Sequence, residues 1–195
     1  MYHELPRGAT FWLFLFSVDQ DLAQSAREKA CPCGGRLHRA NYPRKPRGAE
    51  DLPEDYDYRF SFCCARDGCR KRVTPPSVRF LGRKVYLFAV VVLVSAMRQG
   101  PSPRRVHELW EMFGADRRTI ARWQVFWREQ VPQTSFWKIA RGRLPATAES
   151  VIRVILPRSL LEAFLHGDDL CRQWGLLLRF LSPITITGGL PSKFT

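Results

Sequence analysis

Residues 61–75 read SFCCARDGCRKRVTP, with three cysteines inside seven positions and a glycine directly before the last of them. A second cluster, CPCGG, stands at residues 31–35. Close cysteine pairs accompanied by glycine are typical of the tight turns that present thiolates to a tetrahedral metal ion, because glycine relieves the backbone of such turns. The two clusters therefore predict one metal centre that organises the chain between them.

We expect four thiols to hold Zn²⁺, with Cys31 and Cys33 as the first pair and Cys64 and Cys69 as the second. Thirty residues lie between the two pairs, which is enough for the hairpins of a zinc ribbon. The first pair encloses only one residue where two are usual, so His38 is an alternate ligand. Buried free thiols are the competing interpretation.

Adjacent residues of a strand point to opposite faces, so only one of Cys63 and Cys64 can face the metal. Phe60 and Phe62 alternate with Ser61, which places Cys64 on the face of the phenylalanines. Cys63 is therefore predicted to lie on the other face and is at most an alternate ligand. The remaining cysteine, Cys171, is predicted to be a core residue of an apolar helix.

Residues 31–81 are rich in glycine and proline and contain short alternating stretches such as YDYRFSF at residues 56–62. This texture predicts short strands and turns instead of helices. A module of about 50 residues buries too little surface to be stable without a staple, which again favours a metal.

Helical patterns flank this module. Residues 9–29 predict an opening helix capped by Thr10, with Phe11, Leu15, Val18, Leu22 and Ala26 on its apolar stripe. Residues 83–98 predict an apolar helix of the core. Its run VYLFAVVVLVSAM is too short to span a bilayer, so no membrane partner is expected.

Two further helices are expected near the C-terminus, from Ser159 to about His166 and from Leu170 to Leu181. They can be part of the core, or they can dock a partner such as a second copy of the chain.

Residues 103–130, PRRVHELWEMFGADRRTIARWQVFWREQ, predict two short helices, 103–113 and 117–130. Gly114 is suited to end the first and Asp116 to cap the second. Two short helices joined by such a turn are typical of the DNA-binding helix-turn-helix, whose second helix enters the major groove. The inward positions are predicted to be Val106, Leu109, Trp110 and Phe113 in the first helix, and Ile120, Trp123 and either Val125 or Trp127 in the second.

The chain has 195 residues and a formal charge of +13, with 31 Lys and Arg against 18 Asp and Glu. Residues 34–84 carry an excess of +7 and residues 98–143 an excess of +6, whereas both ends are close to neutral. Basic residues interleaved with apolar ones across the middle of a chain favour a polyanionic partner, which here means nucleic acid.

The predicted DNA contacts fall into two groups. On the second helix of the pair they are Arg117, Arg118, Thr119, Arg122, Gln124 and Arg128, where arginine can bind guanine or phosphate and glutamine can bind adenine. Near the cysteines they are Arg70, Lys71, Arg72, Arg44, Lys45 and Arg47, which are expected to contact phosphates. An ordinary solvated basic helix is the competing interpretation of the first group.

The order RFSFCCARDGCRKRVTPPSVRFLGRKVYL, an apolar helix, and then GPSPRRVHELWEMFGADRRTIARWQVFW resembles the N-terminal targeting portion of insertion-sequence transposases. It also resembles short bacterial transposase-related proteins of the same layout. The resemblance covers about residues 31–130 and implies a zinc ribbon followed by a DNA-binding helix-turn-helix, in a bacterial protein linked to mobile elements.

Those transposases also carry a catalytic domain with three carboxylates that bind two metal ions. Only some 65 residues follow Gln130 here, and their acidic residues are Glu149, Glu162, Asp168 and Asp169. Converging carboxylates need a mixed α/β scaffold, which this segment is too short and too helical to provide. We therefore predict that the chain binds DNA and is not an enzyme.

The predicted fold is mainly α with a small β zinc ribbon. The ranges are an N-terminal helix (1–30), a zinc ribbon (31–81), a three-helix helix-turn-helix domain (82–132) and a C-terminal linker with helices (133–195). No signal peptide is evident, which predicts a cytoplasmic, nucleoid-associated protein. The alternatives are an RNA-binding ribbon that stacks bases on Tyr56, Tyr58, Phe60 and Phe62, and an interaction adaptor for a transposase.

Overall fold

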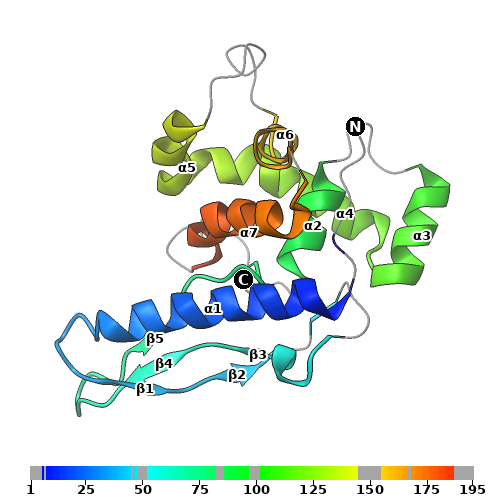
Figure 1. Cartoon of the computed structure of the whole chain (residues 1–195). Coiled ribbons are helices and arrows are strands. Elements are labelled where there is room, and N and C mark those ends of the chain that lie inside the picture. The colour runs from blue at the N-terminus through cyan, green and yellow to red at the C-terminus, as the bar shows by residue number, and fades with distance from the viewer. Residues whose placement is uncertain are drawn as a thin grey trace.

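The computed structural model describes residues 6, 8–44, 46–47, 52–81, 86–96, 102–144, 155–166 and 168–186, without the side chains of residues 105, 112, 113 and 143. Most of the described chain is helical and a smaller part forms short antiparallel strands, as predicted (Figure 1). The α-helices are α1 Ala9–Glu28, α2 Phe88–Ser95, α3 Pro103–Phe113, α4 Arg117–Val125, α5 Ser135–Ala140, α6 Arg158–Phe164 and α7 Leu170–Leu181. The strands are β1 Leu37–Arg39, β2 Tyr42–Pro43, β3 Tyr58–Arg59, β4 Phe62–Cys64 and β5 Arg72–Val73.

The strands form two small antiparallel sheets. One has the order β1-β4-β5 and the other pairs β2 with β3. In the first sheet Leu37 lies opposite Cys64, and His38 lies opposite Cys63. Side chains opposite each other share a face, so this register separates the two adjacent cysteines onto different faces.

Helix α1 lies between the strands and the other helices (Figure 1). It begins at Ala9 after Gly8, whose φ of 105° allows the chain to enter the helix there, so the predicted cap at Thr10 is wrong. Residues Phe11, Leu15 and Val18 of α1 join the main core. Ala23 joins a smaller core under the strands, and α1 therefore contributes to both.

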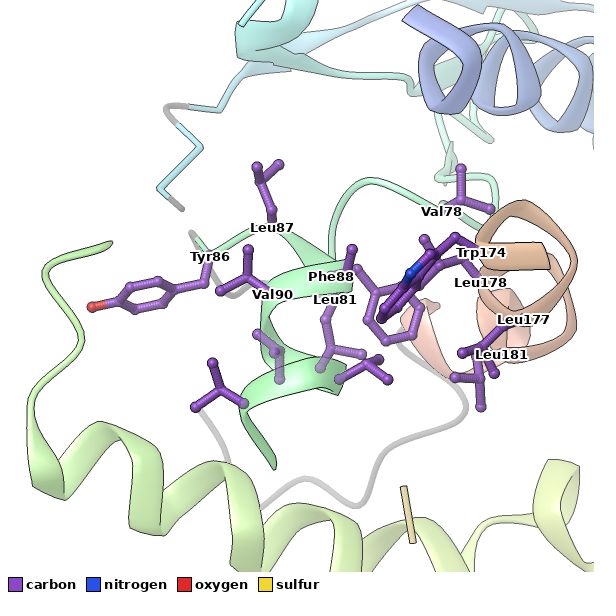
Figure 2. Close-up of a cluster of buried hydrophobic side chains, with 14 of the residues drawn as sticks. Val78, Leu81, Tyr86, Leu87, Phe88, Val90, Trp174, Leu177, Leu178 and Leu181 are labelled. Carbon is purple, nitrogen blue, oxygen red and sulfur yellow. The ribbon is translucent and has the colours of Figure 1, made fainter. Parts of the chain in front are cut away.

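The main core includes residues of segments 78–81 and 86–94 packed against helix α7, as Figure 2 shows for Val78, Leu81, Phe88, Trp174 and Leu178. Trp174 and Leu178 are fully buried, which makes α7 a central core helix. Packing between α1 and α7 is close at Gly175, where an added Cβ would lie 2.4 Å from Cε1 of Phe14. The predicted C-terminal helices are therefore part of the core, and Cys171 is half-buried against it.

Two predictions on helix limits need correction. The apolar helix α2 begins at Phe88, because Tyr86 and Leu87 are extended and form isolated bridges with Arg47 and Phe80. Residues 83–85, predicted to start this helix, lie outside the described residues. After α4 the chain continues as a π-helical turn over Phe126–Gln130, followed by 3₁₀ turns at Val131–Gln133 and Arg141–Arg143. Further 3₁₀ turns span Glu54–Asp57 (η1) and Ser182–Thr185.

A buried ion pair joins α1 to the chain that follows strand β5. Nε of Arg79 donates to Oδ2 of Asp19 at 2.8 Å, and both side chains are fully buried. Asp19 also accepts from the hydroxyl of Ser77 and the backbone N–H of Val78, both at 2.6 Å. Every polar atom of a buried pair must be satisfied for the pair to be tolerated, and here neighbouring backbone completes the network.

The guanidinium of Arg79 also meets the aromatic residues of the strand region. Its Nη1 and Nη2 donate to the carbonyls of Tyr56 and Tyr58, at 3.3 and 3.1 Å. Five rings lie 4.7 to 5.9 Å from its central carbon, namely those of Phe16, Tyr56, Tyr58, Phe60 and Phe80. Cations are attracted to ring faces at such distances, so Arg79 binds the two parts of the fold together.

Candidate metal centre and nucleic-acid interface

The sulfur atoms of Cys31, Cys33, Cys64 and Cys69 all lie within 4.8 Å of one another. The Sγ atoms are 3.8 Å apart between Cys31 and Cys69, and 3.5 Å apart between Cys33 and Cys64. Zn–S bonds of about 2.3 Å in a tetrahedron place sulfur atoms about 3.8 Å apart. The four cysteines predicted as ligands therefore form a cluster that could hold a metal ion, and its geometry is compatible with zinc.

Backbone amides of the two turns point at these sulfurs. The N–H of Arg66 approaches Sγ of Cys64 at 3.4 Å. The N–H of Gly35 donates to Cys33 and, together with the neighbouring thiols, lowers the pKa of Cys33 to about 6. Such hydrogen bonds favour the thiolate, which is the form that binds metal.

For the two most buried cysteines, amide bonding and burial act in opposite directions. The N–H of Arg66 lowers the pKa of Cys64, but burial and the adjacent thiols outweigh it and raise that pKa to about 12. The pKa of Cys31 is raised in the same way, against the bond from the N–H of Cys33. Burial among neighbouring thiols thus disfavours charge on Cys31 and Cys64, whereas a bound cation would favour their thiolate forms.

Gly35 is required where the two turns meet. A Cβ at this position would lie 2.5 Å from Sγ of Cys64 and 3.3 Å from Sγ of Cys33. Arg66 closes the same junction, since its Nη1 donates to the carbonyl of Cys33 at 2.9 Å. The second glycine of CPCGG is thus fixed by contact with the sulfurs, as a metal-binding turn requires.

The alternate ligands lie outside the cluster. Cys63 faces away from Cys64, and its Sγ donates to the carbonyl of Arg70 at 3.3 Å. His38, opposite Cys63 on β1, is exposed on the same outer face. Phe60, Phe62 and Cys64 are all buried in the small core. The strand-face argument from the sequence is confirmed.

Helices α3 and α4 are joined by the turn of residues 114–116. Gly114 has a φ of +63°, and Oδ1 of Asp116 accepts from the N–H of Thr119 at 2.6 Å. This bond lowers the pKa of Asp116. Tyr86 supports the turn from below, because its hydroxyl donates to the carbonyl of Gly114 at 2.8 Å. The predicted stop and cap are both present.

Helix α4 buries Ile120 and Trp123 as predicted. Of the two predicted alternatives for the next inward residue, Trp127 is buried and Val125 is half-buried. In α3 Leu109 is buried, but Trp110, predicted to face inward, is 52% exposed. Figure 1 shows α3 at the edge of the body, which agrees with the exposure of Trp110. The side chain of Phe113 lies outside the described set.

The outward side of α4 is basic. Arg117, Arg118 and Arg122 are exposed, and Arg128 is exposed beside Glu129, to which it donates at 2.8 Å. Thr119 was also predicted to contact DNA, but it is buried. Its N–H donates to the capping carboxylate of Asp116, and its hydroxyl accepts from Nη2 of Arg122 at 2.9 Å.

Three of the remaining predicted contacts lie near the cluster of four cysteines. Arg70 is exposed and pairs with Asp67 at 3.0 Å, and Lys71 is exposed. Arg72 is exposed but anchored, since its Nη1 donates to the carbonyl of Ala40 and the hydroxyl of Ser61.

The other contacts belong to α4 and to the loop after β2. Gln124 is half-buried, and so is Arg44. Arg47 is exposed, and Lys45 lies outside the described residues. The predicted contacts therefore occupy separate places, one of them on α4.

The aromatic residues assigned to base stacking are mostly unavailable. Tyr56, Phe60 and Phe62 are buried, with exposed fractions of 1, 7 and 5%, and only Tyr58 is half-buried. Tyr56 packs on the core, where burial raises the pKa of its hydroxyl well above the usual range. These four residues cannot form the exposed stacking surface that the RNA alternative requires.

The buried pair Asp19 and Arg79 was not predicted. Its one signal in the sequence is an aspartate four positions after Leu15, which places it beside the apolar stripe of the first helix. Among the described residues, no helix is long and apolar enough to span a membrane.

The chain matches no family model, no curated protein and no solved structure.

Proposed function

We propose that this chain is a zinc-stabilised protein that binds double-stranded DNA through helix α4, as a helix-turn-helix of transposase or regulator type. The observation that carries the proposal is the pairing of α3 and α4 across a capped three-residue turn, with Arg117, Arg118 and Arg122 exposed on the first two turns of α4. Residues near the N-terminus of a second helix are those that contact bases and phosphates in such motifs.

The inner side of α4 supports the same assignment. Ile120 and Trp123 anchor the helix, and the ring of Tyr86 meets that of Trp123 edge-on at a centroid distance of 4.9 Å. A DNA-recognition helix must be held rigidly, because contacts with bases depend on where its side chains are placed. The anchored side and the basic side of α4 are thus separate, which leaves the arginines available to a ligand.

Zinc is the metal that we assign to the four cysteines, because a closed set of four thiolates at these separations is typical of structural zinc. When bound, zinc would neutralise part of the thiolate charge and link the turn at residues 31–35 to the turn at residues 64–69. The ion is assigned a structural role, and Gly35 and Arg66 hold the two turns together around it.

The test is binding of zinc-loaded protein to a fluorescein-labelled 30-base-pair duplex of random sequence, measured at several salt concentrations. We expect the logarithm of the binding constant to fall linearly with that of the salt concentration, by about 0.9 for each phosphate contact. Arg118→Ala and Arg122→Ala should weaken binding and relax the base preference selected from a randomised duplex library, whereas Arg141→Ala on the body should change neither.

Absence of salt-dependent duplex binding at low ionic strength would refute the proposal. Displacement of the duplex by an equal concentration of single-stranded or hairpin RNA would favour the RNA alternative instead. Equal effects of Arg118→Ala and Arg141→Ala would remove α4 from the interface.

A further inference from the structure

The chain after β2, described at Arg44, Pro46 and Arg47 and called the arm below, leads from the strands to Tyr86, which contacts the turn between α3 and α4. Strand β2 pairs with β3, and the N–H of Arg44 then donates to the carbonyl of Asp57. At the end of the segment Arg47 forms a bridge with Tyr86, and its carbonyl accepts from the N–H of Leu87 at 2.8 Å. The sequence grouped Arg47 with the cysteine module, but its backbone is fixed to the residues that precede α2.

Tyr86 connects this segment to the DNA-binding helices of the proposal. Its backbone pairs with Arg47, its hydroxyl donates to Gly114, and its ring packs on Trp123. Figure 2 shows Tyr86 at the border of the main core, with its ring pointing away from Trp174. One buried tyrosine therefore separates Arg47 from the turn that leads into α4.

The side chain of Arg47 is exposed, and its backbone is constrained by the bridge to Tyr86 and by Pro46 before it. Arg44 differs, because it is half-buried beside η1, which carries three acidic residues. An exposed arginine whose backbone is held is a suitable phosphate ligand, since its guanidinium can donate two parallel hydrogen bonds to phosphate oxygens. The planar guanidinium also loses little conformational entropy for each hydrogen bond that it forms.

We propose that Arg47 binds a backbone phosphate of the same DNA duplex that helix α4 contacts, so that arm and helix form one interface. This inference rests on the proposed function. It separates Arg47 from Arg70 and Lys71, on the loop between β4 and β5, and from Arg72, the first residue of β5. This loop and β5 lie toward the C-terminal end of α1 (Figure 1).

The experiment compares Arg47→Ala, Arg47→Lys and Arg118→Ala in the salt titration with the 30-base-pair duplex. Arg47→Ala should reduce the salt slope by about 0.9, which is the loss of one phosphate contact. Arg47→Lys keeps a cation at the same place and should keep the wild-type slope. Arg141→Ala removes one exposed arginine from the body and should also leave the slope unchanged. The bridge to Tyr86 uses backbone atoms, so none of these variants should disturb folding.

Stoichiometry tests whether arm and helix share one duplex. Titration of the wild-type chain with a 15-base-pair duplex should give one duplex per chain, and Arg47→Ala should leave that ratio unchanged. A ratio of two that falls to one in Arg47→Ala would show that the arm binds a separate duplex and would overturn the inference.

The inference and the proposed function can fail separately. If Arg118→Ala weakens binding while Arg47→Ala behaves like Arg141→Ala, the inference is wrong and the proposed function stands. If neither Arg118→Ala nor Arg47→Ala differs from Arg141→Ala, the proposed function fails and the inference fails with it.

Discussion

The cysteine module and the helical body solve the problem of stability in different ways. Among the described residues the main core of the body contains 31 buried side chains, whereas the core under the strands contains six, of which two are the cysteines Cys31 and Cys64. Hydrophobic burial stabilises in proportion to the apolar area removed from water, so the body can be stable by itself. The module buries far less apolar area, so we expect it to depend on a metal ion held by its four cysteines.

The largest effect should come from a change that removes the metal ligand and leaves the body intact. Cys64→Ser should abolish stoichiometric zinc binding and lose the ordered signals of residues 31–73, because structural zinc supplies roughly 10–16 kcal/mol in small domains. The helical signal in circular dichroism should largely persist. Zinc content, circular dichroism and amide NMR spectra measure the three outcomes.

Cys63→Ser is the matched control, since it changes the adjacent thiol on the outer face of the same strand. It should bind one equivalent of zinc and keep the wild-type spectrum. Zinc loss in Cys63→Ser with retention in Cys64→Ser would contradict the ligand assignment, and collapse of the body in Cys64→Ser would erase the contrast between the two regions.

A smaller effect is expected at the joint between module and body. Asp19→Ala leaves the buried guanidinium of Arg79 without its carboxylate, which typically costs about 3–5 kcal/mol in the free energy of unfolding. Asp21→Ala, an exposed change on the same helix, should stay within about 0.5 kcal/mol of wild type. Urea unfolding followed by tryptophan fluorescence measures both. Equal midpoints for the two variants would mean that the pair does not hold the regions together.

The smallest effect concerns the cap of α4. The folded-state pKa of Asp116 is lowered below its ordinary value of 3.8, chiefly by the N–H of Thr119. The charged cap therefore stabilises the fold above pH 3.8, and this contribution is lost as the pH falls through the lowered folded-state pKa. Asn also caps helices but carries no charge. The difference in melting temperature between wild type and Asp116→Asn should shrink on acidification.

The same titration after treatment with a chelator sharpens the contrast between the regions. The cap lies in the body, so the pH dependence of the difference should be unchanged by removal of metal. A difference that disappears with the metal would show that the folding of α4 depends on the cysteine module.

Local patterns predicted what depends on local physics. The limits of α3 and α7, the stop at Gly114 and the cap at Asp116 follow from periodicity and capping, and each is present in the structure. Strand alternation likewise predicts that Cys64, and not Cys63, lies with the other three cysteines of the cluster. Such features are decided by residues within one or two turns of each other, which the sequence displays directly.

What the sequence could not predict depends on partners distant along the chain. Trp110 has the spacing of an inward residue, yet among the described residues no element buries it and it is 52% exposed. Tyr86 and Leu87 belong to the same apolar run as α2, yet they are extended because Arg47 and Phe80 pair with them. In the sequence Asp19 resembles an ordinary helix aspartate, because its partner Arg79 lies 60 positions later along the chain.

The close contact between Phe14 and Gly175 has a consequence for how the protein is made. It joins the first helix to the last, so the apolar side of α1 leaves the ribosome long before α7 exists to cover it. At about 5–20 residues per second, roughly seven to thirty seconds of synthesis separate the two helices. During that interval Phe11, Leu15 and Val18 present an uncovered stripe, and a chaperone that binds apolar helices has time to hold the nascent chain.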